Sequence, residues 1–393
     1  MKVIVIGAGL SGAAVASALA QRGAEVTVLD LASAPAAGAS SLPAGLMAPY
    51  ISKDDNLTSQ LVRLGLALTT TECQRLLRAG VDWQVCGALQ IPFKQTQGDD
   101  QPAVWHANAA WVKPEALVRA WLAQPSISFK GGMSVQRVTC DAAQNSPTSS
   151  NLLDPPHSRF LHAASPPVWR AFDAADQCVA EASALVVAAS VGSSLLAGLE
   201  LHAVAGQIIT GLWSSEWQSA SSQRTNPDQW GQNQRETEPA ALNHHALNGH
   251  GHFIPAVAGA AGKPDFWLSG STYEHGSTPS GITDQGIKAN CHRLALLLPA
   301  AVLLLEQEQQ AKRLRAWAGL RCTTRDRLPA AGSVDPSALP GLYASVGMGS
   351  RGLSFAAICG QLVAEQIMGH TCSLPEGLQH ALRPARLKLQ PFQ

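Results

Sequence analysis

The sequence predicts an α/β protein in which a parallel-sheet domain is interleaved with a second, mostly antiparallel β domain. Three observations predict this fold. Residues 3–6 are an entirely apolar run, typical of a strand that is buried on both faces. Residues 184–190 and 341–349 are two further apolar runs that end in small residues, like the first. The stretches between these runs carry short β patterns, which indicates that one domain is interrupted twice by another.

The first 30 residues carry a nucleotide-binding pattern. Gly7, Gly9 and Gly12 follow the first strand at G-x-G-x-x-G spacing and open an alanine-rich helix predicted over residues 10–22. In this pattern the glycines allow a tight turn, the approach of the backbone to a pyrophosphate, and close packing of helix on strand. The helix N-terminus offers free N–H groups to the phosphates. The next strand ends in Asp30, where an acid can bind a ribose. Together these features predict a Rossmann-type domain that binds a dinucleotide, without saying which one.

Local patterns predict the other elements. Helices are expected over residues 52–79, 111–122, 284–298 and 353–368, and strands over residues 25–30, 85–93, 127–138, 253–255, 266–273 and 314–321 and from residue 204 onward. Residues 141–167 and 214–252 are polar and resemble loop insertions. We therefore assign residues 1–84, 168–203 and 312–393 to the nucleotide-binding domain, and 85–167 and 204–311 to a substrate domain.

Composition limits the function classes. The 393 residues are 46% hydrophobic and 14% charged, as in a globular protein with a large buried fraction. Lys and Arg together number 28, as do Asp and Glu, so the overall field does not steer the chain toward nucleic acid. Contact with RNA would need a local patch, for which the candidates are Lys312, Arg313, Arg315, Arg321, Arg325, Arg327, Arg383, Arg386 and Lys388.

Further features of the sequence argue against a zinc-binding protein and a membrane protein. The eight cysteines form no C-x-x-C pair, which excludes a zinc ribbon and favours reduced thiols in a cytoplasmic protein. No metal site is expected at His244, His245, His250 and His252, because acids and cysteines are absent at ligand spacing. The longest apolar run after the first strand, residues 294–305, is broken by Pro299 and is too short to span a bilayer, so no membrane association is expected.

Several segments of the chain resemble a known family. It is similar to FAD-dependent amine oxidoreductases of the D-amino-acid oxidase and glycine oxidase superfamily, and within it most similar to the FAD domain of the bifunctional tRNA 5-methylaminomethyl-2-thiouridine biosynthesis enzyme. The matching segments are residues 7–12, 38–40, 44–45, 111–114, 204–207, 319–332 and 347–353. The segments 45–55, 319–329 and 349–353 carry the likeness to the tRNA enzyme. The chain begins directly on the FAD domain, so the resemblance implies the oxidative step alone, with any methylation left to a separate methyltransferase protein.

The resemblance implies a reaction. The substrate would be an N-substituted glycine, namely the carboxymethylaminomethyl group of a tRNA wobble uridine. A hydride would pass from the glycine CH₂ to the flavin, and hydrolysis of the imine would give glyoxylate and aminomethyl uridine. Arg321 and Arg351 are expected to bind the carboxylate, Arg321 first, because a guanidinium binds carboxylates bidentately. For either residue an ordinary structural salt bridge stays open.

Two other side chains are candidates for the catalytic site. Tyr273 would cover the substrate, or else is simply a packed tyrosine. Lys53 is the one candidate for a general base, or else an ordinary surface lysine. The residues expected to bind FAD are Gly7, Gly9, Leu10, Ser11, Gly12, Asp30, Ser40, Ala44, Gly45, Leu46, Val135, Ala189, Gly347, Gly349, Ser350, Arg351, Gly352 and Leu353.

Alternatives stay open on the sequence alone. An oxidase or dehydrogenase of free glycine, sarcosine or D-amino acids would use the same chemistry. The net charge of zero favours such a small amino-acid substrate, whereas the three specific segments favour tRNA. A flavin-binding subunit without turnover is a second alternative. The C-terminal glycine-rich segment argues against an NAD-dependent dehydrogenase. The sequence predicts neither the electron acceptor nor the oligomeric state.

Overall fold

The computed structural model describes residues 1–92, 103–141, 167–222, 244–276 and 281–387. A six-stranded sheet forms the centre of the first domain, in the order β19-β20-β12-β1-β2-β8. Every neighbouring pair is parallel except β19 and β20. The strands are β1 (Lys2–Ile6), β2 (Glu25–Leu29), β8 (Ile127–Lys130), β12 (Ala184–Val187), β19 (Ala330–Ser333) and β20 (Leu342–Val346). The apolar runs that predicted a buried parallel sheet therefore form its three central strands.

Both faces of this sheet are covered. On β1, Val3 and Val5 pack against helices, whereas Ile4 and Ile6 pack on the opposite face against a three-stranded antiparallel sheet. That small sheet contains β9 (Arg137–Asp141), β10 (Val168–Phe172) and β11 (Cys178–Ala182). The helices of the domain are α1 (Leu10–Ala20), α2 (Leu57–Leu76), α3 (Pro114–Leu122), α4 (Ser193–Ala197), α8 (Gly352–Met368) and α9 (Glu376–Leu382).

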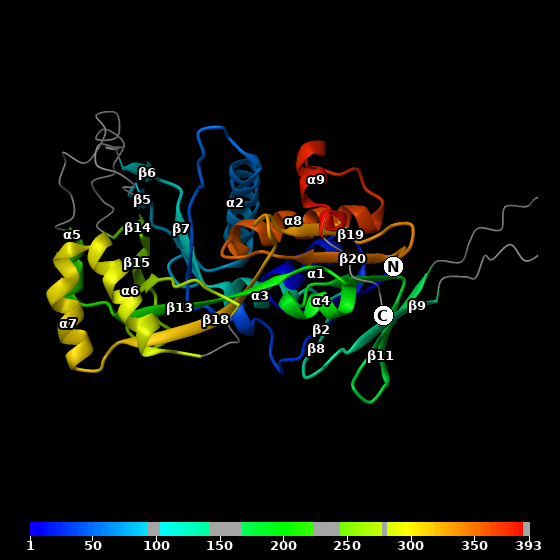
Figure 1. Cartoon of the computed structure of the whole chain (residues 1–393), viewed down its shortest axis with the longest axis horizontal. Coiled ribbons are helices and arrows are strands. Elements are labelled where there is room, and N and C mark those ends of the chain that lie inside the picture. Colours follow the sequence, from blue (N-terminus) through cyan, green and yellow to red (C-terminus); the bar gives the residue numbers. More distant parts are fainter. Residues whose placement is uncertain (93–102, 142–166, 223–243, 277–280, 388–393) are drawn as a thin grey trace, which may run out of the picture.

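The second domain is built on an eight-stranded sheet in the order β17-β13-β16-β15-β14-β5-β6, with β18 paired to β13. Helices α5, α6 and α7 cover its outer face and lie together at one end of the molecule, with β9 and β11 at the other end (Figure 1). The elements are β5 (Ala88–Gln90), β6 (Val104–His106), β13 (His202–Leu212), α5 (Ser215–Ser222), β14 (Ala246–Gly249), β15 (Gly251–Val257), β16 (Phe266–Gly270), β17 (Glu274–His275), α6 (Asp284–Leu297), α7 (Val302–Gln310) and β18 (Arg315–Thr323).

The inner face of the eight-stranded sheet packs toward the first domain. Its apolar residues Ile208, Ile254 and Leu268 meet Ala44 and Trp111 in one cluster. Trp111 belongs to a further three-stranded sheet, which contains β3 (Gly45–Met47), β4 (Trp83–Val85) and β7 (Ala110–Val112). This small sheet therefore joins the two domains beside the site described below.

Several elements lie across the domain boundaries that the sequence predicted. Helix α3 packs against α1, and β9 packs on the six-stranded sheet, although we had assigned residues 85–167 to the substrate domain. Two further strands, β8 and β18, show the same difference through their pairing. Strand β8 belongs to the six-stranded sheet, where it pairs with β2, although we had assigned its residues to the substrate domain. Strand β18 pairs with β13 from Arg315 to Thr323, although we had assigned it to the nucleotide-binding domain. The local sequence of each strand predicts a strand but does not indicate the sheet that it joins. Only the pairing partner shows to which domain the strand belongs.

Helix α2 starts later than predicted. The segment from Ser52 was expected to open this helix, but the helix begins at Leu57. Its cap is Asn56, whose side chain accepts a hydrogen bond from the Ser59 N–H at 3.1 Å. Ser52 accepts a bond from the Asn56 N–H and so belongs to the loop before the helix.

Of the two predicted insertions, residues 142–166 and 223–243 lie outside the described residues. No described helix combines the length and the apolar character that crossing a bilayer requires.

Candidate active site

One cavity of about 1470 Å³ extends between the two domains. Its lining includes the residues that follow β1, β2, β12 and β20, and it continues along the inner face of the eight-stranded sheet. Single small molecules occupy pockets of about 300–1,000 Å³. The cavity therefore has room for a large ligand together with a second, smaller one.

The first glycine turn fits the role of a backbone cradle. Gly7 has φ +111°, and a Cβ at this position would lie 2.4 Å from the Ala188 carbonyl oxygen. A Cβ on Gly12 would lie 1.8 Å from the Gly7 oxygen, so Gly12 allows α1 to pack closely on β1. Gly12 does not line the cavity itself. Only glycines can give this turn its shape, and Gly7 and Gly9 present backbone to the cavity.

Asp30 lies at the end of β2 and lines the same part of the cavity. Its carboxylate accepts the Ala8 N–H at 2.6 Å and the Ala32 N–H at 2.8 Å. A carboxylate has about four acceptor sites, so two remain for the hydroxyls of a ribose. The backbone bonds fix the carboxylate in place before any ligand binds.

A second glycine turn lies between β20 and α8. Gly347 and Gly349 have φ of +76° and +56°, and the segment from Gly347 to Ser354 lines the cavity. The N-cap of α8, Arg351, makes no capping bond with its side chain. The positive end of the dipole of α8 therefore faces the cavity, where it can stabilise negative charge.

Arg321 reaches the cavity from β18, across a glycine on the neighbouring strand. A Cβ on Gly206 would lie 2.1 Å from Nη1 of Arg321, so the guanidinium occupies the space that this glycine leaves. It donates hydrogen bonds to Ser271 Oγ at 2.7 Å and to the Thr272 carbonyl at 3.1 Å. Burial lowers the pKa of Arg321, while Tyr273 opposes this shift. Among the described residues no acid forms an ion pair with Arg321, so its role as a structural salt bridge is not observed.

Aromatic rings lie over both candidate arginines. The Arg321 Cζ lies 4.5 Å from the centroid of the Tyr273 ring, and the Arg351 Cζ lies 4.8 Å from that of Tyr50. Tyr273 is 52% exposed, so it covers the guanidinium without being part of the core. Tyr50 was not predicted as a site residue, although it lies in the segment 45–55 that carried the likeness to the tRNA enzyme.

The cavity brings most of the predicted site residues together. Two predicted residues do not line it, namely Gly12 and Ala44; Ala44 is fully buried in the cluster between the domains. Lys53 lines it and is exposed. The other predicted residues that line it are Gly7, Gly9, Leu10, Ser11, Asp30, Ser40, Gly45, Leu46, Val135, Ala189, Tyr273, Arg321, Gly347, Gly349, Ser350, Arg351, Gly352 and Leu353.

The sequence also did not predict four polar residues that line the cavity along the second domain. Gln90, His106, Asn248 and His252 come from strands of the second domain and line its inner end. They lie in short, separate strands whose local sequence carries no motif, so only the sheet brings them together. Burial, with a smaller contribution from the charge of Arg321, lowers the pKa of His252 to about 4, so this imidazole is uncharged at neutral pH.

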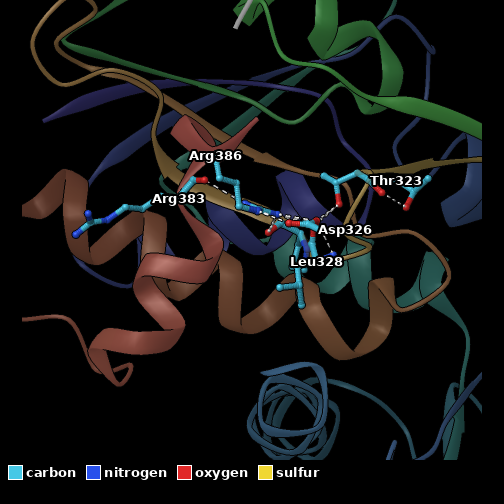
Figure 2. Close-up of polar contacts among 7 residues, drawn as sticks. Thr323, Asp326, Leu328, Arg383 and Arg386 are labelled. Carbon is cyan, nitrogen blue, oxygen red and sulfur yellow. Dashed lines mark hydrogen bonds and ion pairs between the residues drawn. The ribbon is translucent and has the colours of Figure 1, made fainter. Parts of the chain in front are cut away.

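The basic residues considered for an RNA patch have different roles. Figure 2 shows the side chain of Arg386 directed at Asp326 and the side chain of Arg383 extending away from these contacts. The Arg386 Nε lies 2.7 Å from Oδ2 of Asp326, and Arg386 donates to the Arg383 carbonyl. Arg386 also donates to the carbonyls of Leu328 and Pro329. It therefore holds the loop between β18 and β19. Arg313 pairs with Glu308, and Lys388 lies outside the described residues.

The histidines of the predicted polar insertion contact aromatic rings. The ring of His244 lies edge-on to Trp213 at 5.4 Å, and that of His245 edge-on to Trp105 at 5.3 Å. Within the described ranges no group of three or more His, Cys, Asp or Glu side chains is placed to hold a metal ion.

Comparison with protein families identifies the fold and the cofactor. The model of the FAD dependent oxidoreductase family matches residues 2–145 and 160–366. The chain belongs to this family. Its members use FAD, and the predicted cofactor and enzyme class are thereby confirmed. The predicted α/β fold class is confirmed as well.

Relatives of this FAD dependent oxidoreductase include bifunctional tRNA-modifying proteins. It is 35% identical to the tRNA 5-methylaminomethyl-2-thiouridine biosynthesis bifunctional protein MnmC of Polaromonas sp., over 97% of this chain and 59% of that protein. The protein of the same name from Verminephrobacter eiseniae is 34% identical over 98% of this chain and 63% of its own length. The chain thus spans about three fifths of the length of these relatives.

Solved structures show the same fold at low identity. Glycine oxidase from Geobacillus kaustophilus has a TM-score of 0.67 and 18% identity, with 96% of this chain and 97% of that chain covered. Iminodiacetate oxidase from Chelativorans sp. has a TM-score of 0.63 and 17% identity, with 97% and 98% covered. At this identity the likeness shows the fold alone.

Proposed function

We propose that this FAD dependent oxidoreductase oxidises an N-substituted glycine, the carboxymethylaminomethyl group of a tRNA wobble uridine, to aminomethyl uridine and glyoxylate. The observation that carries the proposal is Arg321. Its guanidinium is partly desolvated, faces the cavity, and has no acid as a partner among the described residues. A buried cation of this kind is costly unless an anion pairs with it, and a substrate carboxylate supplies that anion. The choice of tRNA rests on the names of the relatives.

The cofactor would be held by the two glycine turns. Gly7 and Gly9 would bind its pyrophosphate and Asp30 its ribose, while the turn at Gly347 and the N-terminus of α8 would hold the flavin end. When bound, FAD supplies the acceptor for the hydride that leaves the glycine CH₂. The residues fit this group because the glycines of the two turns, Gly7, Gly9, Gly347 and Gly349, leave backbone open to that part of the cavity.

The protein's own side chains would position the substrate. Arg321 would bind the carboxylate with the two nitrogens that now contact Ser271 and Thr272, with Arg351 as a second cation. Tyr273, which stacks on Arg321, would cover the carboxylate and exclude water from it. Oxidation of the amine needs only its neutral form, so no general base is assigned, and Lys53 stays a candidate for mutation. Because the substrate is tRNA, we place the reaction in the cytoplasm.

The test compares tRNA with a small amine. Purified protein loaded with FAD is incubated with tRNA that carries carboxymethylaminomethyl uridine, and the nucleosides are then analysed. We expect conversion to aminomethyl uridine together with release of glyoxylate. Turnover of sarcosine or glycine with unchanged tRNA would show a free amino-acid oxidase or dehydrogenase instead. A flavin that stays oxidised with every substrate under anaerobic conditions would show a binding subunit without turnover.

A further inference from the structure

Side chains from six strands form one continuous row on the inner face of the eight-stranded sheet. The register pairs Gln90 of β5 with Asn248 of β14, and Asn248 with His252 of β15. His252 in turn is opposite Gly270 of β16, which pairs with Ile208 of β13. Every member of this row that has a side chain lines the cavity: Val104, Gln90, Asn248, His252, Ile208 and Trp317.

The row changes character along its length. Ile208 and Trp317 are apolar: Trp317 lies on β18, the strand that also carries Arg321, and Ile208 is opposite it on β13. Gly270 leaves a gap, and the far part contains the uncharged polar residues His252, Asn248 and Gln90. A carboxylate bound at Arg321 would therefore leave the rest of a long substrate to extend past apolar side chains toward neutral polar ones.

The two amides of the row contact each other and, among the residues that the structure describes, leave one donor group and one acceptor group without a side-chain hydrogen bond. The Asn248 Nδ2 donates to the Gln90 Oε1 at 2.7 Å. This bond leaves N–H groups on Gln90 and a carbonyl oxygen on Asn248. If both amides are rotated by half a turn, the two roles exchange, and one donor and one acceptor still remain side by side. Both side chains are half-buried in the cavity wall, where an unused amide group costs free energy unless a ligand pairs with it.

We propose that the Gln90–Asn248 amide pair binds the O4 and N3–H edge of the uracil base of the substrate. This proposal rests on the proposed function and names the part of the cavity that would take the base. Uracil presents an acceptor at O4 and a donor at N3–H next to each other, which matches one N–H and one carbonyl oxygen. Cytosine presents a donor and an acceptor at these positions in the opposite order, so in the same position it would pair only after both amides had rotated.

The strand spacing places the amide pair near the proposed carboxylate site. The Arg321 guanidinium lies over Gly206 and bonds Ser271, the residue after Gly270 of the row. Asn248 and Gly270 are two strand positions apart, which is roughly 10 Å for strands of ordinary spacing. The glycine-containing arm leaves the ring at C5, next to O4 and roughly at right angles to the edge that the amide pair would bind, so the arm does not occupy the same space as the amides. A base taken out of its stack is the form in which enzymes modify single nucleotides, and loops expose such bases.

The test removes the amides and keeps the shape. Gln90→Leu and Asn248→Leu are compared with wild type on the nucleoside 5-carboxymethylaminomethyluridine and on sarcosine, which has no base. We expect kcat/KM for the nucleoside to fall by about tenfold to a hundredfold in each variant, the cost of unpaired polar groups on the base. With sarcosine we expect no change. Gln84→Leu is the matched control, because Gln84 is an exposed amide on β4 away from the cavity.

A binding measurement gives a readout independent of turnover. Calorimetry with the product nucleoside 5-aminomethyluridine and its N3-methyl derivative measures whether the N3–H is recognised. Wild type should bind the N3-methyl derivative about tenfold more weakly, and the Gln90→Leu/Asn248→Leu double variant should bind both alike. Thermal melting of each variant checks that it is folded.

The outcomes separate this proposal from the proposed function. If wild type oxidises neither the nucleoside nor modified tRNA, the proposed function fails and takes the base subsite with it. If wild type oxidises them and the two Leu variants retain their activity on the nucleoside, only the base subsite is wrong. Equal losses on sarcosine and on the nucleoside would also overturn it, because they would show a structural role of the amides.

Discussion

The guanidinium of Arg321 lies under the ring of Tyr273, with Cζ 4.5 Å from the ring centroid, although 48 positions of sequence separate the two residues. The contact exists because β18 and the end of β16 both flank β13, so the two side chains meet above the same strand. Burial lowers the pKa of Arg321, but Arg titrates so high that the group stays charged. The ring thus covers a fixed, partly desolvated cation in the cavity.

Replacing Arg321 with Lys should impair substrate binding severely, because an ammonium cannot reproduce the planar two-nitrogen contact with a carboxylate. The charge is retained but a hydrogen bond to the carboxylate is lost, which costs about 1.5 to 3 kcal/mol, so kcat/KM for an N-substituted glycine should fall roughly tenfold to a hundredfold. The measurement is the rate of anaerobic flavin reduction against substrate concentration. Arg315→Lys is the control, since Arg315 lies on the same strand but is exposed outside the cavity. A variant that keeps wild-type kcat/KM would exclude Arg321 from the carboxylate site.

Gly206→Ala should disturb Arg321 without touching the cofactor. The added methyl group would lie 2.1 Å from Nη1, so the guanidinium must move away from Ser271 and Thr272. We expect KM for the substrate to rise while the flavin content of the purified protein stays unchanged. Gly377→Ala is the control, because a Cβ at Gly377 meets nothing within 4 Å. Normal KM in Gly206→Ala would mean that the position of Arg321 is not set by this glycine.

The sequence could predict the nucleotide part of the site because its chemistry is local. Strand, glycine turn, helix and Asp30 are contiguous, and the turn needs glycine for reasons that a sequence displays directly. Gly12 has the packing role that the pattern predicts, because a Cβ there would lie 1.8 Å from the Gly7 oxygen, and it does not line the cavity.

The substrate end could not be predicted in this way. Tyr50, Gln90 and Asn248 reach the cavity through strand pairing between segments far apart in the chain. The same holds for strand β18. Its apolar pattern is compatible with either sheet, and only its long pairing with β13 shows that it belongs to the second domain. Periodicity gave no information about this end. Arg321, which was named through the resemblance, lines the cavity, and its role stays a prediction.

Tyr273 should ionise at lower pH than Tyr343. Burial raises the pKa of Tyr273, but Arg321, together with Ser350, Ser271 and Arg351, lowers it by more, so the net shift is downward. Burial alone raises the pKa of Tyr343. An alkaline titration followed by tyrosinate absorbance should therefore show Tyr273 ionising before Tyr343. Tyr273→Phe should remove the earlier step, and Tyr343→Phe the later one. If Tyr273→Phe leaves the earlier step in place, the stacking on Arg321 does not tune this phenol.

The Arg386–Asp326 pair should make stability depend on pH in acid. Burial raises the pKa of Asp326, but the bonds from Arg386 and Thr324, with further help from Leu328, lower it by more. A depressed carboxyl pKa adds stability that is present above the unfolded value of about 4 and is lost as pH falls through the folded value. Because Asp326 is 44% exposed, Asp326→Asn should cost at most about 1 kcal/mol at neutral pH, and less as the pH falls below about 4. Urea unfolding of wild type, Asp326→Asn and the exposed control Asp54→Asn at several pH values measures this difference. A cost for Asp326→Asn that does not shrink in acid would show that the pair contributes through packing and not through its charge.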